Sequence, residues 1–117
     1  MNFRDRNREA VTETREQEPL LVLVDEFVRT TNVPVLVPDL RGFVSFMVEV
    51  PRAREMFISP AYIFHTLRDM VAEGLVMHTA HGYTLTDEGT DEAMRVRQRE
   101  PEIARRAAEV VRDYAVQ

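Results

Sequence analysis

The sequence contains no cysteine, no tryptophan and no lysine, and only four of its 117 residues are glycine. Without cysteine the chain can form neither disulfides nor cysteine-ligated zinc sites, and it has no thiol chemistry. The glycines are not spaced as in a phosphate-binding loop, and neither Ser45 nor Ser59 has the flanking glycines of a nucleophile elbow. We therefore expect no enzyme active site, no metal site and no cofactor.

Long apolar runs are also missing. A membrane-spanning helix needs about 18 or more consecutive apolar residues, and the sequence has no such run. Residues 1–18 are charged throughout and lack the apolar stretch of a secretion signal. We therefore expect a cytoplasmic protein with no membrane partner. Its composition, 44% hydrophobic and 30% charged residues, is typical of one folded domain.

The charge balance is acidic. All fifteen basic residues are arginine, and twenty acidic residues bring the formal net charge to −5. An acidic total is unfavourable for binding to nucleic acid, because the phosphate backbone is itself negative. Arginine-only usage has two explanations that the sequence leaves open: codon bias in a GC-rich genome, or adaptation of the surface to a salt-rich cytoplasm.

Helical spacing of apolar residues predicts most of the chain as helix. The clearest helix covers residues 60–73, because Ser59 and Pro60 suit its start and Gly74 suits its end. Its buried face is expected to consist of Ile63, Leu67, Met70 and Val71. Further helices are predicted over residues 19–31, 38–50, 87–99 and 101–116, with Pro19 in a first turn and Thr86 as a cap.

Short β-branched segments predict the strands. Residues 33–37 form a small strand, and residues 75–79 and 83–85 form a hairpin around Ala80-His81-Gly82. A helix-turn-helix followed directly by a hairpin is the winged-helix layout. We therefore predict a mainly α fold with a small β-hairpin. In it, residues 1–18 form a charged N-terminal arm or helix, residues 19–99 a winged helix-turn-helix domain, and residues 100–117 a C-terminal dimerisation helix.

The segment 57–94 resembles the winged-helix core of PadR-like transcriptional regulators and, more distantly, that of MarR-like ones. It contains a Ser-Pro turn, an Ile-aromatic pair, a Gly-Leu-Val exit from the helix and a Tyr-x-Leu-Thr-x-x-Gly motif. These are residues Ser59, Pro60, Ile63, Phe64, Leu67, Gly74, Leu75, Val76, Tyr83, Leu85, Thr86 and Gly89. The acidic, lysine-free composition is also similar to that of haloarchaeal regulators of this type. The resemblance implies a homodimeric regulator that binds a pseudo-palindromic operator in double-stranded DNA.

In a winged helix the helix 60–73 would enter the major groove and the hairpin 75–85 would be the wing. Side chains opposite the apolar face, and those at the start of the helix, are then the expected base contacts. They are Ser59, Ala61, Tyr62, His65, Thr66 and Arg68, and the alternative is that these residues only form the solvated face of a structural helix. Arg52 and Arg54 precede the helix, and His78 and His81 flank the wing tip. These four residues are expected to contact DNA or, alternatively, to be ordinary solvated residues.

The C-terminal segment carries an apolar stripe that a winged-helix core has no obvious means of covering. We expect a second copy of the chain to cover it, and the alternative is packing against the chain's own first helix. The stripe consists of Ile103, Ala107, Val110, Val111 and Tyr114.

Two functional alternatives stay open. The wing contains no Arg or Lys, which would suit a winged-helix module that binds another protein and does not read DNA. A small-molecule effector is a possible further partner of a regulator. Its pocket would be lined by residues that are better explained as core, namely Phe27, Phe43, Phe46 and Met47.

Overall fold

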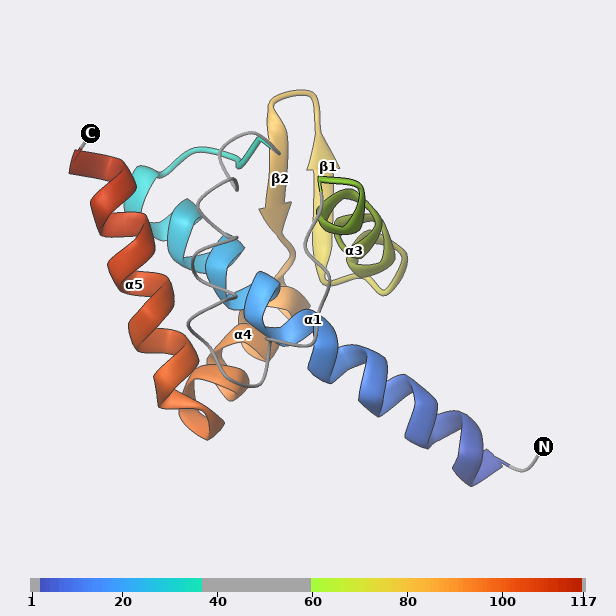
Figure 1. Cartoon of the computed structure of the whole chain (residues 1–117). Coiled ribbons are helices and arrows are strands. Elements are labelled where there is room, and N and C mark those ends of the chain that lie inside the picture. Colours follow the sequence, from blue (N-terminus) through green and yellow to red (C-terminus); the bar gives the residue numbers. More distant parts are fainter. Residues whose placement is uncertain (1–2, 37–59, 117) are drawn as a thin grey trace.

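The computed structural model describes residues 3–36 and 60–116, and it describes side chains for residues 17–36 and 63–113. These ranges form a mainly helical fold with one two-stranded antiparallel sheet, as expected. The predicted helix 38–50 lies outside the described residues. The elements are α1 (Phe3–Thr31), α3 (Pro60–Ala72), β1 (Val76–Thr79), β2 (Gly82–Leu85), α4 (Asp87–Arg99) and α5 (Pro101–Val116) (Figure 1).

Helix α1 is longer than the sequence pattern indicated. The prediction that a helix begins at Pro19 is wrong, because one continuous helix starts at Phe3 and contains Pro19 in its interior. Proline removes one backbone N–H and so costs the helix a hydrogen bond at this point. The arginines and glutamates of residues 3–18 are good helix formers even without an apolar face. The charged segment is therefore a helix, which projects away from the rest of the described fold (Figure 1).

The middle of α1 is the centre of the hydrophobic core. Five consecutive residues, 20–24, are each at most 2% exposed. Because successive helical residues point in different directions, such a run means that the helix is covered on every side. Helices α3, α4 and α5 and strand β2 all contact it. None of the described helices is long and apolar enough to cross a membrane.

Helix α3 ends as its sequence predicts. Gly74 adopts a φ of +78°, and the backbone N–H of Gly74 donates to the carbonyl of Val71 (3.1 Å). The N–H of Leu75 donates to the carbonyl of Met70 (2.9 Å). These two bonds form a Schellman motif, which satisfies carbonyls at the helix end. Leu75 then leads directly into β1.

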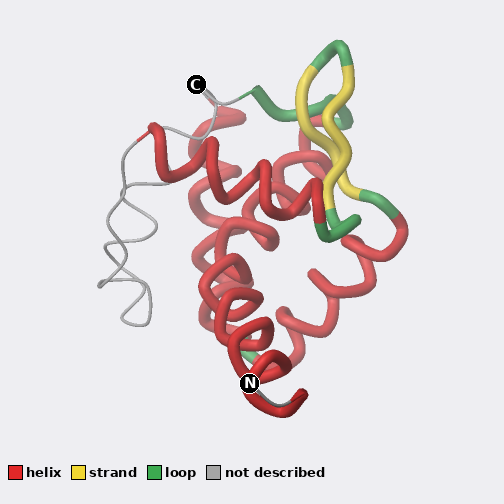
Figure 2. Tube along the Cα trace, turned by 90° about the vertical axis from the view of Figure 1, so that its right-hand side faces the viewer, coloured by secondary structure: helices red, strands yellow, loops and turns green. Residues whose placement is uncertain are grey.

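The hairpin protrudes from the helical part of the protein (Figures 1 and 2). β1 and β2 pair in register from Val76 opposite Leu85 to Thr79 opposite Gly82. The predicted strand 33–37 is reduced, within the described residues, to one bridge between Val35 and Tyr83. Their backbone N–H groups and carbonyls exchange two hydrogen bonds of 2.8 Å. The chain after α1 is thus fastened to the outer side of β2.

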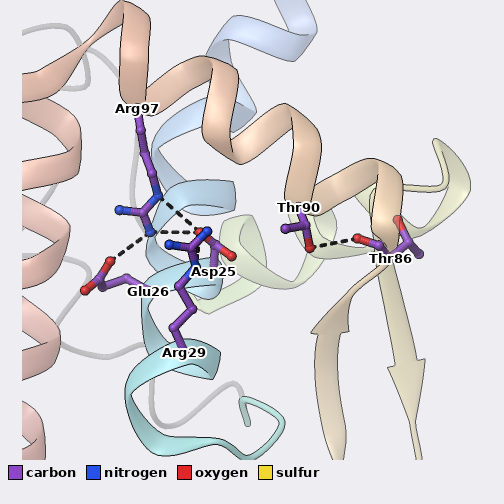
Figure 3. Close-up of polar contacts among 6 residues, drawn as sticks. All are labelled: Asp25, Glu26, Arg29, Thr86, Thr90 and Arg97. Carbon is purple, nitrogen blue, oxygen red and sulfur yellow. Dashed lines mark hydrogen bonds and ion pairs between the residues drawn. The ribbon is translucent and has the colours of Figure 1, made fainter.

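Helix α4 begins at the predicted cap. The hydroxyl of Thr86 accepts a hydrogen bond from the N–H of Gly89 (3.0 Å) and donates to the carbonyl of Gly74 (2.5 Å). The first role satisfies a donor of the new helix, and the second ties it to the end of α3. Thr90 donates from its own hydroxyl to the carbonyl of Thr86 (3.0 Å), which reinforces the same turn (Figure 3).

Helix α5 packs on its own chain. The expectation that a second copy covers its apolar stripe is wrong for the described residues of that stripe. Ile103, Ala107 and Val111 are at most 2% exposed within the single chain, and half-buried Val110 packs against the same core. Helix α1 is their main neighbour. The reason is that the apolar part of α1 around residues 20–24 also supplies the layer that covers α5, as the alternative of packing against the first helix required. The side chain of Tyr114 lies outside the described range.

Ion pairs clamp α4 onto α1. The carboxylate of Asp25 is 3% exposed, and it accepts hydrogen bonds from Nε (3.1 Å) and Nη2 (2.8 Å) of Arg97. The same Nη2 reaches Glu26 (2.8 Å), while Arg29 lies 3.3 Å from Asp25 (Figure 3). About two turns earlier in α1, buried Glu18 pairs with Arg99 near the end of α4. Buried acids are thus matched by arginines that are more than 70 residues away in the sequence.

Candidate nucleic-acid interface

Helix α3 presents an exposed face that begins where its apolar face ends. Ile63, Leu67 and Met70 are at most 4% exposed, as their spacing predicted. His65 and Arg68, both expected at the interface, are exposed on the opposite side together with Asp69. A recognition helix needs such an arrangement, with one face held by the core and the other free to enter a groove.

The two flanks of α3 differ from the expectation. Thr66 was expected to reach DNA, but it is only 6% exposed and lies on the core side. Val71 was expected in the core, but it is 37% exposed. Phe64 is also exposed, at 48%. The covered sector of the helix is therefore rotated toward Thr66 and away from Phe64 and Val71.

Other expected contact residues are placed only in part. Ala61 and Tyr62 lie in the first turn of α3, and their side chains are outside the described range. Ser59, Arg52 and Arg54 lie outside the described residues altogether. Of the six expected base contacts, His65 and Arg68 thus have side chains that are described and exposed.

The hairpin holds its two histidines in different ways. His78 stacks on Tyr83 with ring centroids 4.2 Å apart and the rings tilted by only 6°. Tyr83 is buried and is held by the bridge to Val35, so it anchors His78 at one face of the hairpin. His81 is exposed at the tip. Its N–H donates to the hydroxyl of Thr79 (3.1 Å), which fixes the turn and leaves the imidazole accessible.

The charge on this surface is low. Between residues 60 and 85 the sequence contains one base, Arg68, and two acids, Asp69 and Glu73. A conventional DNA-binding surface places several Lys and Arg residues against phosphates. Contacts from α3 and the hairpin would therefore depend mainly on base edges and less on phosphate charge. Within the described residues, no group of three His, Asp or Glu side chains could hold a metal ion.

Sequence reasoning missed one feature of this region and one of the contact between α1 and α4. Phe64 was recognised only as part of a motif, although at about 100° per residue it lies well away from the line through Ile63 and Leu67. Its position on a helical wheel could have indicated exposure. The ion pairs between Asp25 and Arg97 carry no local signal, because their partners lie 72 residues apart.

No family model, curated protein or solved structure matches this chain.

Proposed function

We propose that this protein is a sequence-specific DNA-binding transcriptional regulator of the winged-helix type, related to PadR-like regulators. Helix α3 enters the major groove and the hairpin acts as the wing. The observation that carries the proposal is the order of two elements. The uninterrupted helix α3, whose exposed face bears His65 and Arg68, is followed directly by a protruding hairpin. The bridge between Val35 and Tyr83 adds a third chain segment beside the hairpin, which supports the same assignment.

The regulator acts as a homodimer on a pseudo-palindromic operator. Because the stripe of α5 is buried on α1, the second copy must bind elsewhere. The projecting first half of α1 is the best candidate for the dimer contact (Figure 1). A helix of about 15 residues or fewer is only marginally stable in water by itself, so contact with a partner helix would stabilise this segment. Uncharged residues recur along this segment at alternating spacings of four and three, namely Phe3, Asn7, Ala10 and Thr14. This is the spacing of positions that face a partner helix in a coiled coil, and here apolar Phe3 and Ala10 alternate with polar Asn7 and Thr14.

Binding of the full-length protein to a duplex selected from a random pool tests the proposal. Arg68→Ala should weaken binding to the selected duplex by roughly 1–3 kcal/mol, if Arg68 contacts a guanine edge. Arg95→Ala is the matched control, because Arg95 is an exposed arginine of α4 whose side chain pairs with Glu92. It should leave the Kd unchanged. An equal loss on selected and random DNA would instead assign Arg68 to a phosphate.

A winged-helix module that binds another protein is the second candidate. Two observations favour it: the hairpin has no Lys or Arg, and Met77 on β1 is 48% exposed. This candidate predicts that the wild-type protein selects no sequence from the pool at any ionic strength. Selection of a defined motif would contradict it.

A further inference from the structure

Helix α3 carries an exposed aromatic side chain that the fold does not need. Phe64 is 48% exposed, whereas Ile63 next to it is 4% exposed and Leu67 is fully buried. Burial of a phenylalanine side chain is worth about 1.5–3 kcal/mol, so this fold leaves part of that stabilisation unused. Two exposed rings lie side by side here, because Phe64 and His65 meet edge to face with centroids 6.3 Å apart.

Phe64 is also next to Arg68, the one arginine in α3. Residues four apart on a helix are neighbours on its surface, so Phe64 and Arg68 share one row. Both side chains are exposed, and Val71, which lies about one turn after Arg68, is exposed as well. An apolar ring beside a guanidinium matches two groups that the major groove offers on adjacent base pairs. These are the 5-methyl group of thymine and the O6 and N7 acceptors of guanine.

We propose that Phe64 reads thymine in the operator through contact with its 5-methyl group, beside a guanine contacted by Arg68. This inference rests on the proposed function, since it requires α3 to lie in the major groove. It adds to that function a chemical basis for the preference of the protein for one DNA sequence. Low positive charge on α3 and the hairpin leaves few phosphate contacts, so base contacts carry a larger share of the binding free energy.

The test compares one selected duplex with the same duplex in which deoxyuridine replaces thymine. This replacement removes only the methyl group and keeps every hydrogen-bonding group of the base pair. The wild-type protein should bind the uracil duplex more weakly, by about fourfold for each methyl group contacted. Phe64→Ala should bind the thymine duplex more weakly and should no longer distinguish the two duplexes. Phe64→Leu keeps an apolar side chain and should retain part of the preference.

A matched control separates this contact from a general effect of removing an exposed apolar side chain. Met94 of α4 is 46% exposed, so Met94→Ala removes a comparable surface group away from α3. It should leave both affinities and their ratio unchanged. Thermal unfolding of Phe64→Ala should show a folded protein, because the side chain is half exposed.

The outcomes distinguish the inference from the function on which it rests. Sequence-specific binding by the wild-type protein with no difference between thymine and uracil duplexes would overturn the role of Phe64 and leave the proposed function standing. If Phe64→Ala binds both duplexes more weakly by the same factor, it keeps the wild-type preference for thymine over uracil. That result would likewise overturn the role of Phe64 and leave the proposed function standing. Failure of the wild-type protein to select any duplex would overturn both.

Discussion

At the scale of single residues, Gly89 shows how closely the turn before α4 is packed. A Cβ atom at this position would lie 1.8 Å from the carbonyl oxygen of Leu75 and 2.8 Å from its carbonyl carbon. Both atoms belong to the backbone, so no side-chain rotation can relieve the overlap. The start of α4 can cross the start of β1 only because residue 89 has no side chain. This crossing also positions Thr86 to bond with the end of α3.

Gly89→Ala should therefore destabilise the protein by about 3 kcal/mol or more, because α4 must move away from β1. Gly74→Ala is the informative comparison. Gly74 has a φ of +78° but open space around its Cβ position, with the Glu88 carboxylate 3.6 Å away as the closest atom. It should cost only about 1 kcal/mol of backbone strain. Chemical denaturation measures both values, and a smaller loss at Gly89 than at Gly74 would contradict the crossing geometry.

At the scale of elements, the contact between α1 and α4 depends on charges that the core has buried. Asp25 is held by Arg97 from α4 and by Arg29 from its own helix. A buried carboxylate that loses its partner keeps the cost of desolvation without the compensating attraction. The pair therefore specifies how the two helices dock, since a shifted helix would leave Asp25 without Arg97.

Arg97→Met should lower the free energy of unfolding by about 3 kcal/mol, because Asp25 then retains only the longer contact to Arg29. Arg95→Met on the same helix is the control. Arg95 is 62% exposed and pairs with Glu92 on the surface, so its loss should cost about 0.5 kcal/mol or less. Adding Asp25→Asn to Arg97→Met should recover part of the stability. Equal effects of the two arginine substitutions in urea unfolding would show that the ion pair between Asp25 and Arg97 adds nothing to the free energy of unfolding.

At the scale of the whole molecule, the first prediction concerns self-association through the projecting half of α1. Ala10→Asp places a charge in the proposed seam and should convert a dimer into a monomer. Thr12→Asp adds the same charge about 200° around the helix and should leave the dimer intact. Sedimentation equilibrium at micromolar concentration measures both. A wild-type protein that sediments as a monomer would rule out this mode of assembly.

The second prediction at this scale concerns salt. The chain carries a net charge of −5, so it repels the DNA backbone at low ionic strength. Salt screens this repulsion while it weakens the few arginine contacts. We expect the affinity for one selected duplex to change little, or to increase, between about 0.1 M and 2 M KCl, with cations bridging acidic side chains and phosphates.

Asp69→Asn tests the cause of this salt response, because Asp69 is an exposed acid of α3 beside Arg68. Removal of its charge should strengthen binding more at low salt than at high salt. Glu102→Gln removes an exposed acid from α5 instead and should change the salt response less. A steep fall in the affinity of the wild-type protein with rising salt would show ordinary phosphate binding and would refute the adaptation to salt.

Much of the fold follows from signals that act within a few residues. Gly74 ends α3 and Thr86 begins α4 in the structure as in the sequence, because a cap is satisfied by its own neighbours in the chain. The hairpin, the start of α3 at Pro60 and the apolar stripe of α5 were predicted for the same reason. The face of α3 with His65 and Arg68 was also evident from helical periodicity alone.

Other features were decided only by tertiary structure. Periodicity shows that a helix has an apolar face, but it does not show what covers that face. The stripe of Ile103, Ala107 and Val111 thus suggested a second copy of the chain, whereas the chain's own α1 buries it. In the same way, helical periodicity could indicate that Phe64 lies outside, but not that the polar Thr66 on the other flank of α3 is buried. The physical reason is common to these cases: burial depends on contacts between segments far apart in the chain, and the local pattern does not encode which segments meet.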